Sequence, residues 1–344
     1  MMVCVRWIEW DSGGAEAGLR MHGIWRHFGM IWRLATVDAR IDDGVSSGTR
    51  MGHSRCPVMR VARGFTLIET LVVVAVIALL VGLLLPGLAR ARACVRSTKE
   101  LATGQQVMTA YHLYSVDYRD WLLPGYPPAS WVSAQVTTNT GAVVTGEEAQ
   151  RYVWRLAPYL GSHLPGLYPE EKLYTFILSD EPNYIQNGQN ASYVLSLYPS
   201  LGLNASFFGG NDRRQQFDRV TRQVFGRVYL ERISDAQRPS EDYVFVSARS
   251  AVNPLVPDLG APEGFFRVEP PVYGAAQGRL WSLAYDKKAA TPEVNSGNVS
   301  LRHWGKGVAA HLDGHAGLQG WDEMSDMRHW ADGATSVEWG IAPR

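Results

Sequence analysis

The chain has no excess of charge of either sign, and it has few of the short motifs that mark common enzyme sites. Its 344 residues include 33 Lys and Arg against 33 Asp and Glu, so the formal net charge is zero. Nucleic-acid binding gets no support from this balance. A His-Glu-x-x-His zinc motif and a phosphate-binding glycine loop are absent from the sequence, and the Gly-x-Ser-x-Gly pattern of a nucleophile turn occurs only at residues 44–48, near the N-terminus. The sequence therefore predicts neither an enzyme nor a nucleic-acid partner.

Long apolar runs are also rare, with one exception. Phe65 to Leu85 is a run of 21 residues in which Glu69 is the only charge. A helix of this length spans roughly 30 Å, the thickness of the hydrocarbon core of a bilayer. The run therefore predicts one membrane-crossing helix, with a charged carboxylate that needs an explanation.

Basic residues flank this run on both sides, with Arg55, Arg60 and Arg63 before it and Arg90, Arg92 and Arg96 after it. The first group favours an N-terminus in the cytoplasm and a head outside the inner face, and the second weakens that inference. A secretory signal peptide is the alternative. It has a shorter apolar core of about 7–15 residues and a small-residue cleavage site, whereas this run is followed by Pro-Gly-Leu-Ala-Arg-Ala-Arg. A retained anchor fits better.

Residues 64 to 69 read Gly-Phe-Thr-Leu-Ile-Glu, directly after the basic segment. They resemble the processing site of the type IV prepilins and the type II secretion pseudopilins. The resemblance implies that a prepilin peptidase cuts after Gly64 and methylates the new N-terminal Phe65. It also implies that Phe65, Glu69 and Pro86 pack against neighbouring subunits in a filament built at an inner-membrane assembly platform.

The resemblance offers an explanation for the charge of Glu69. In the family this glutamate is thought to meet the N-terminal amine of a neighbouring subunit, and a buried carboxylate with a cationic partner is tolerable whereas an unpaired one is costly. The alternative is that Glu69, only five residues from the cytoplasmic end, reaches back to the lipid headgroups.

A leader of residues 1–64 is unusually long. If translation starts at Met51, the leader has 14 residues and residues 1–50 have no function; the alternative is a cytoplasmic extension that docks an assembly protein. Cleavage would remove Cys4 and Cys56 and leave Cys94 alone, with a net charge of about −3. We therefore expect the exported head to be held by its core or a metal rather than by disulfides.

After Pro86, apolar residues recur at three- and four-residue steps up to Asp117. We expect a helix from 65 to 117, with a membrane part at 65–85, an amphipathic part at 86–117 and a bend at Pro86 or Gly87. The head, 118–344, contains an apolar strand at 241–248, and residues 126–190 read as a variable insertion. The expected fold is α+β and pilin-like: a long N-terminal helix packed on a mainly antiparallel β head.

The C-terminus contains His303, nine further residues and then Asp313-Gly314. Together with the segment at 114–125, this element resembles a group of bacterial prepilin-like proteins that carry a C-terminal His-(nine residues)-Asp-Gly element. Two interpretations stay open. His303, Asp313 and His315 could bind a divalent metal, or Asp313-Gly314 could be the two-residue turn of a hairpin, of type I′.

Three functions fit these patterns. The first is a structural subunit of a type IV pilus-like or type II secretion pseudopilus-like filament. The second is a binding module for polysaccharide or protein, with C-terminal tryptophans as contacts unless they fill the core. The third is an anchored metal-dependent hydrolase that uses the histidines. The tryptophans concerned are Trp304, Trp321, Trp330 and Trp339.

Overall fold

The computed structural model describes residues 66–132, 136–138, 141–168, 174, 191–253 and 260–344. Residues 66–344 form one compact unit. The leader, with Gly64 and Phe65, lies outside the described residues.

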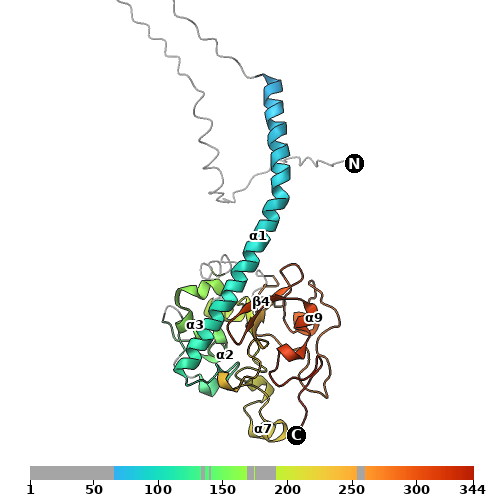
Figure 1. Ribbon diagram of the computed structural model, residues 1–344. Helices are drawn as coiled ribbons and strands as arrows, with labels where there is room; N and C mark the ends of the chain where they lie inside the picture. Colours follow the sequence, from blue (N-terminus) through green and yellow to red (C-terminus); the bar gives the residue numbers. More distant parts are fainter. Residues whose placement is uncertain (1–65, 133–135, 139–140, 169–173, 175–190, 254–259) are drawn as a thin grey trace, which may run out of the picture. The chain divides into compact units, whose positions relative to one another are not determined.

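Helix α1, Leu67–Asp117, is 51 residues long and continues through Pro86 without interruption. Its N-terminal half projects from the head, and its C-terminal half packs on the head (Figure 1). The first buried residue is Ser97, so the turns before it carry their apolar side chains on the surface. The helix ends at Asp117, where Arg119 and Asp120 adopt positive φ values of 55° and 73° and turn the chain away.

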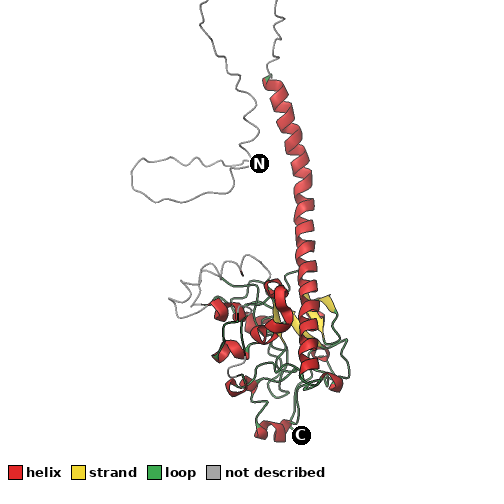
Figure 2. Ribbon diagram, turned by 90° about the vertical axis from the view of Figure 1, so that its left-hand side faces the viewer, coloured by secondary structure: helices red, strands yellow, loops and turns green. Residues whose placement is uncertain are grey.

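A four-stranded sheet lies beside α1 in the head (Figure 2). The strands are β1, Leu201–Leu203, β2, Tyr243–Ser247, β3, Gly307–His311, and β4, Ala316–Gln319. They lie in the order β1-β2-β3-β4, and every neighbouring pair is antiparallel. The predicted α+β fold, with a long helix on an antiparallel sheet, is confirmed. The strands are short, and much of the described head consists of loops and short helices.

Helix α1 lies close to the sheet because a glycine faces it. A Cβ added to Gly104 would lie 3.3 Å from Ala316 Cβ and 3.4 Å from Ala310 Cβ, so larger side chains at these positions would separate the helix from the strands. About two turns further along the helix, Tyr111 packs edge-on against Phe245 of β2, with ring centroids 5.6 Å apart.

The first and the middle residue of β2 contact different parts of the head. The pairing of β2 with β3 is irregular between Tyr243 and Phe245. Phe245 contacts Tyr111 of α1 and Tyr152 of α3, Tyr152–Leu160. Tyr243 contacts Trp330 in the C-terminal segment. The remaining described α-helices are α2, Gly146–Gln150, α6, Ala191–Leu197, α7, Arg219–Phe225, α8, Pro292–Ser296, and α9, Trp321–Met324.

The segment expected to be an insertion, 126–190, contributes to the core where it is described. Tyr152, Trp154 and Leu156 of α3 are at most 2% exposed. The Tyr152 hydroxyl donates to the carbonyl of Leu201 in β1 at 2.6 Å. The sequence did not predict this helix because it has only nine residues. An apolar stripe of that length gives too weak a periodic signal.

Candidate functional site

The first candidate site is the start of α1. Thr66 and Glu69 form a capping box: the Thr66 backbone N–H and hydroxyl donate to Glu69 Oε2 at 2.8 and 2.9 Å, and Glu69 N–H donates to Thr66 Oγ1 at 3.3 Å. This pattern satisfies N–H groups that the first helical turn leaves without partners. This capping role of Glu69 was not predicted, although Thr-x-x-Glu before an apolar run is the sequence signal of a capping box.

The second feature is the exposed apolar surface of α1 that follows the capping box. Of the described residues, α1 is the one helix long and apolar enough to cross a membrane, and none of its most apolar window is buried against the protein. The exposed side chains include Leu71, Ile77 and Leu84. So large a continuous apolar surface is unstable in water and requires lipid or protein around it.

The third site joins α1 to the head through Glu100. Its carboxylate accepts hydrogen bonds from Arg302 Nε at 2.8 Å and Nη2 at 2.5 Å, and from Ser247 Oγ at 2.7 Å. His303 Nε2 lies 2.5 Å from Glu100 Oε2. Glu100 and His303 are each 7% exposed. We call Glu100, Ser247, Arg302 and His303 the helix clasp.

Two opposing effects act on the pKa of Glu100 in the helix clasp. Burial works to raise the pKa of Glu100, but the Arg302 charge and the hydrogen bonds of Arg302, His303 and Ser247 outweigh it and lower the pKa to about 2. Arg302 also donates to the carbonyls of Ala248 and Ser200, at 2.8 and 2.7 Å. The buried pair therefore has most of its hydrogen-bonding groups satisfied, which is the condition for a buried ion pair to be stable.

The two ends of the C-terminal element serve separate sites. His303 precedes β3 and belongs to the helix clasp, whereas Asp313 follows β3 in the loop to β4. There Asp313 Oδ1 accepts from the His315 backbone N–H at 3.0 Å and lies 2.6 Å from His315 Nδ1. His311 stacks on His315 with ring centroids 3.9 Å apart.

This arrangement does not support the metal interpretation. Within the described ranges, no group of three or more His, Cys, Asp or Glu side chains is placed to hold a metal ion. His303, Asp313 and His315 were the proposed ligands, and the nine residues between the first two include the whole of β3. His303 and Asp313 are close in sequence, but the extended strand between them keeps them apart in space.

The loop from β3 to β4 differs from the expected type I′ turn. Gly314 N–H donates to the carbonyl of His311 at 2.9 Å, and His311 N–H donates to the carbonyl of His315. Gly314 has a φ of 96°, whereas Leu312 and Asp313 are not among the residues with positive φ. A type I′ turn needs positive φ at both central residues. The loop therefore has three residues, with glycine at its left-handed position.

Tertiary contacts explain the extra loop residue. The backbone N–H groups of Leu312 and Asp313 donate to the carbonyls of Asp242 and Pro239, at 3.1 and 3.0 Å. The Leu312 carbonyl lies 2.7 Å from Nε2 of His112 in α1. The loop is thus held by the segment before β2 and by α1, which sequence patterns do not reveal.

The four C-terminal tryptophans have different environments. Trp330 is fully buried, and its indole N–H donates to the Met324 carbonyl at 2.8 Å. Trp304 is 63% exposed. Trp321 packs beside Trp281 with ring centroids 5.3 Å apart, and Trp339 lines a cavity. They do not form one aromatic face.

Comparison with known proteins adds one finding. Residues 59–85 match the family model of the prokaryotic N-terminal methylation motif. This match supports a type IV pilin-like protein. It points to a structural pilin rather than an enzyme, and it is compatible with a single-pass inner-membrane anchor. No curated protein and no solved structure matches the chain. The match ends before the C-terminal element, whose resemblance stays a prediction.

Proposed function

We propose that this type IV pilin-like chain is a structural subunit of a pilus-like or pseudopilus-like filament. The proposal rests on one observation: the methylation motif at 59–85 includes the start of a 51-residue helix, whose apolar half is not buried by the protein and whose other half packs on the head. Such a helix can leave lipid and enter a helical bundle of subunits without refolding the head.

The proposed maturation begins with a prepilin peptidase. It cuts after Gly64 and methylates Phe65, which leaves Thr66 as the second residue and the capping box intact. Before assembly the protein is a single-pass inner-membrane protein with its N-terminus in the cytoplasm and its head outside. Its further partners are other pilin-like subunits and an inner-membrane assembly platform.

Glu69 has a role in each state. In the single chain, both contacts with Thr66 side-chain and backbone donors use Oε2. The other oxygen, Oε1, can accept from the amine of a neighbouring Phe65 when helices pack. A cationic partner supplied by the neighbour would make burial of this carboxylate favourable.

Mass spectrometry of the purified chain tests the processing. From a bacterial host that has a prepilin peptidase, the chain should begin with N-methyl-phenylalanine at Phe65; from the same host without the peptidase, it should keep its leader. Gly64→Val should block cleavage because a β-branched side chain crowds the cut site, while Gly52→Val in the leader should not. An intact start at Met51 or Met1 in the presence of the peptidase would overturn the proposal.

A further inference from the structure

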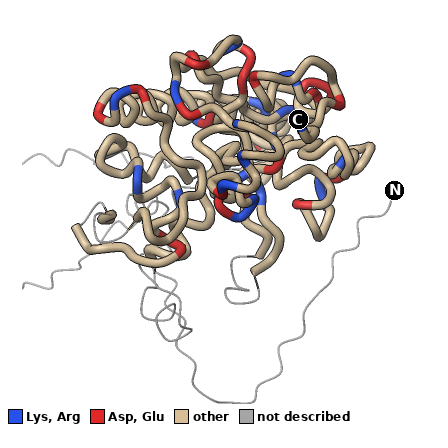
Figure 3. Tube along the Cα trace, turned by 90° about the horizontal axis from the view of Figure 1, so that it is seen from below, with Lys and Arg blue, Asp and Glu red and all other residues tan. Residues whose placement is uncertain are grey.

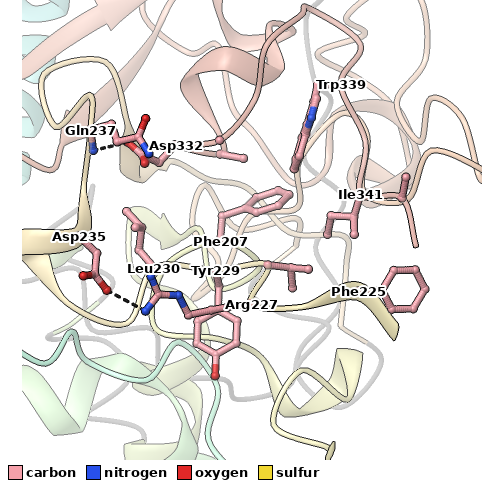
Figure 4. Close-up of a pocket in the computed structure, with 14 residues that line it drawn as sticks. Phe207, Phe225, Arg227, Tyr229, Leu230, Asp235, Gln237, Asp332, Trp339 and Ile341 are labelled. Carbon is pink, nitrogen blue, oxygen red and sulfur yellow. Dashed lines mark hydrogen bonds and ion pairs between the residues drawn. The ribbon is translucent and has the colours of Figure 1, made fainter. Parts of the chain in front are cut away.

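A cavity of about 270 Å³ opens in the head beside the end of α7 and the C-terminal segment. Figure 4 shows its lining, in which an apolar side faces a polar side. In Figure 1, α7 and the C-terminus lie at the end of the head opposite to the exposed half of α1. A ligand in this cavity would therefore be held away from the membrane anchor.

The apolar side is rigid and partly aromatic. Phe207 is 2% exposed and Ile341 is 7% exposed, so both are fixed by the core. Trp339 lies beside Phe207 with ring centroids 6.2 Å apart, and Phe225, the last residue of α7, completes this side. Aromatic rings of this kind offer a flat apolar contact surface to a ligand.

The polar side carries groups of both signs. Arg227 Nη1 lies 2.9 Å from Asp235 Oδ2, as an ion pair without the geometry of a directed hydrogen bond. Asp332 Oδ1 accepts from the backbone N–H groups of Gln237 and Arg238, at 2.8 and 2.9 Å. Two carboxylates and a guanidinium therefore present acceptors and donors side by side, on a frame fixed by backbone hydrogen bonds.

The combination selects a class of ligand. Arg227 and Asp235 offset each other's charge, and Asp332 is already held by two backbone N–H groups, so the lining offers no strong uncompensated charge to a cation or an anion. A neutral molecule that has hydroxyl donors and acceptors on its edge and an apolar face can use both sides of the cavity. The volume lies just below the range of about 300–1,000 Å³ that holds drug-sized ligands, so the cavity has room for one ring. We propose that this cavity binds a single neutral sugar ring.

The proposal concerns the head alone and does not depend on cleavage or filament assembly. It is tested on the full chain in lauryldimethylamine oxide micelles, because glycoside detergents would compete for the site. Saturation-transfer difference NMR is measured with methyl glucoside and methyl galactoside as neutral probes, and with glucuronate and glucosamine as charged rings of similar size. We expect at least one neutral probe to bind with a Kd on the order of 1 mM, as weak single-ring contacts give, and the charged rings to bind more weakly.

A blocking variant connects binding to this cavity. Gly333 lines the cavity, has an ordinary φ and leaves open space around an added Cβ, so Gly333→Trp should fill the entrance without unfolding the head. It should weaken binding at least tenfold, and Trp339→Ala should do the same. Val252→Trp, at a 54% exposed position outside the lining, is the matched control and should bind like the unaltered chain.

Three results would each overturn the proposal. These are no binding of either neutral probe at tens of millimolar, unchanged binding by a folded Gly333→Trp variant, and tighter binding of a charged ring than of its neutral counterpart. If Trp339→Ala unfolds the head, Gly333→Trp decides the question alone. Thermal melting of each variant establishes that it is folded.

Discussion

His303 Nε2 lies 2.5 Å from Glu100 Oε2, although the two residues are 203 positions apart in the chain. The contact ties the start of the C-terminal element to the helix that carries the methylation motif. Arg302, next in sequence, binds the same carboxylate at 2.5 Å. Force on α1 during extraction from a membrane would thus be transmitted to the centre of the head through a buried ion pair.

Removal of the Glu100 carboxylate should destabilise the head strongly. Glu100→Ala leaves Arg302 buried without its closest carboxylate, and such a change lowers the free energy of unfolding by about 3–5 kcal/mol. Glu263→Gln is the matched control: Glu263 also pairs with Arg302, at 3.2 Å, but is 44% exposed, so the loss should be below about 1 kcal/mol. Urea unfolding of the full chain, followed by tryptophan fluorescence, measures both. Equal losses would contradict the dominance of the buried pair.

Stability should fall in acid through the same residue. The pKa of Glu100 is lowered to about 2 from an ordinary 4.5, so its stabilisation is present above pH 4.5 and is lost as the pH falls toward 2. The linked free energy is up to about 3 kcal/mol. The difference in unfolding free energy between the unaltered chain and Glu100→Gln should therefore shrink between pH 6 and pH 2, taken as roughly the two limits of this titration. A difference that stays constant over this range would refute the assignment.

Two substitutions at the start of α1 separate the two roles of Glu69. Glu69→Gln keeps a capping side chain, because glutamine also serves in capping boxes, but removes the charge that a neighbouring amine would meet. Thr66→Ala keeps the charge and removes the hydroxyl cap. We expect Glu69→Gln to impair incorporation into filaments and Thr66→Ala to leave it nearly unchanged, as measured by the fraction of subunit recovered in sheared filaments. The reverse order would assign Glu69 to helix capping alone.

The loop between β3 and β4 should depend on Gly314 rather than on the charge of Asp313. Gly314→Val places a β-branched side chain at a φ of 96°, and should lower the free energy of unfolding by about 1–2 kcal/mol. Steric crowding does not cause this loss, since an added Cβ at Gly314 would lie 3.6 Å from His112 Cε1, an ordinary contact. Asp313→Asn keeps the acceptor for the His315 N–H and should be nearly neutral. Thermal melting compares the two, and a larger loss for Asp313→Asn would contradict this account.

Charge is distributed over the head in a way that agrees with its neutral composition. Figure 3 shows Lys and Arg mixed with Asp and Glu along the chain trace, without a face of one sign in this view. The nearest opposite charges are often paired, as in Arg222 with Glu231 at 2.5 Å. The mixed pattern gives no support to a nucleic-acid partner, since phosphate binding relies on concentrated positive charge.

The sequence by itself determined the features that depend on neighbouring residues. The length of α1, its apolar half and the methylation motif are properties of consecutive positions, and β2 lies within the predicted strand at 241–248. Only the tertiary structure decided which distant groups meet. His303 was grouped with Asp313 because ten positions separate them, yet β3 extends between them and His303 meets Glu100 instead. Likewise, backbone hydrogen bonds to Asp242 and Pro239 set the loop at Gly314. Such contacts come from chain packing, which local periodicity does not encode.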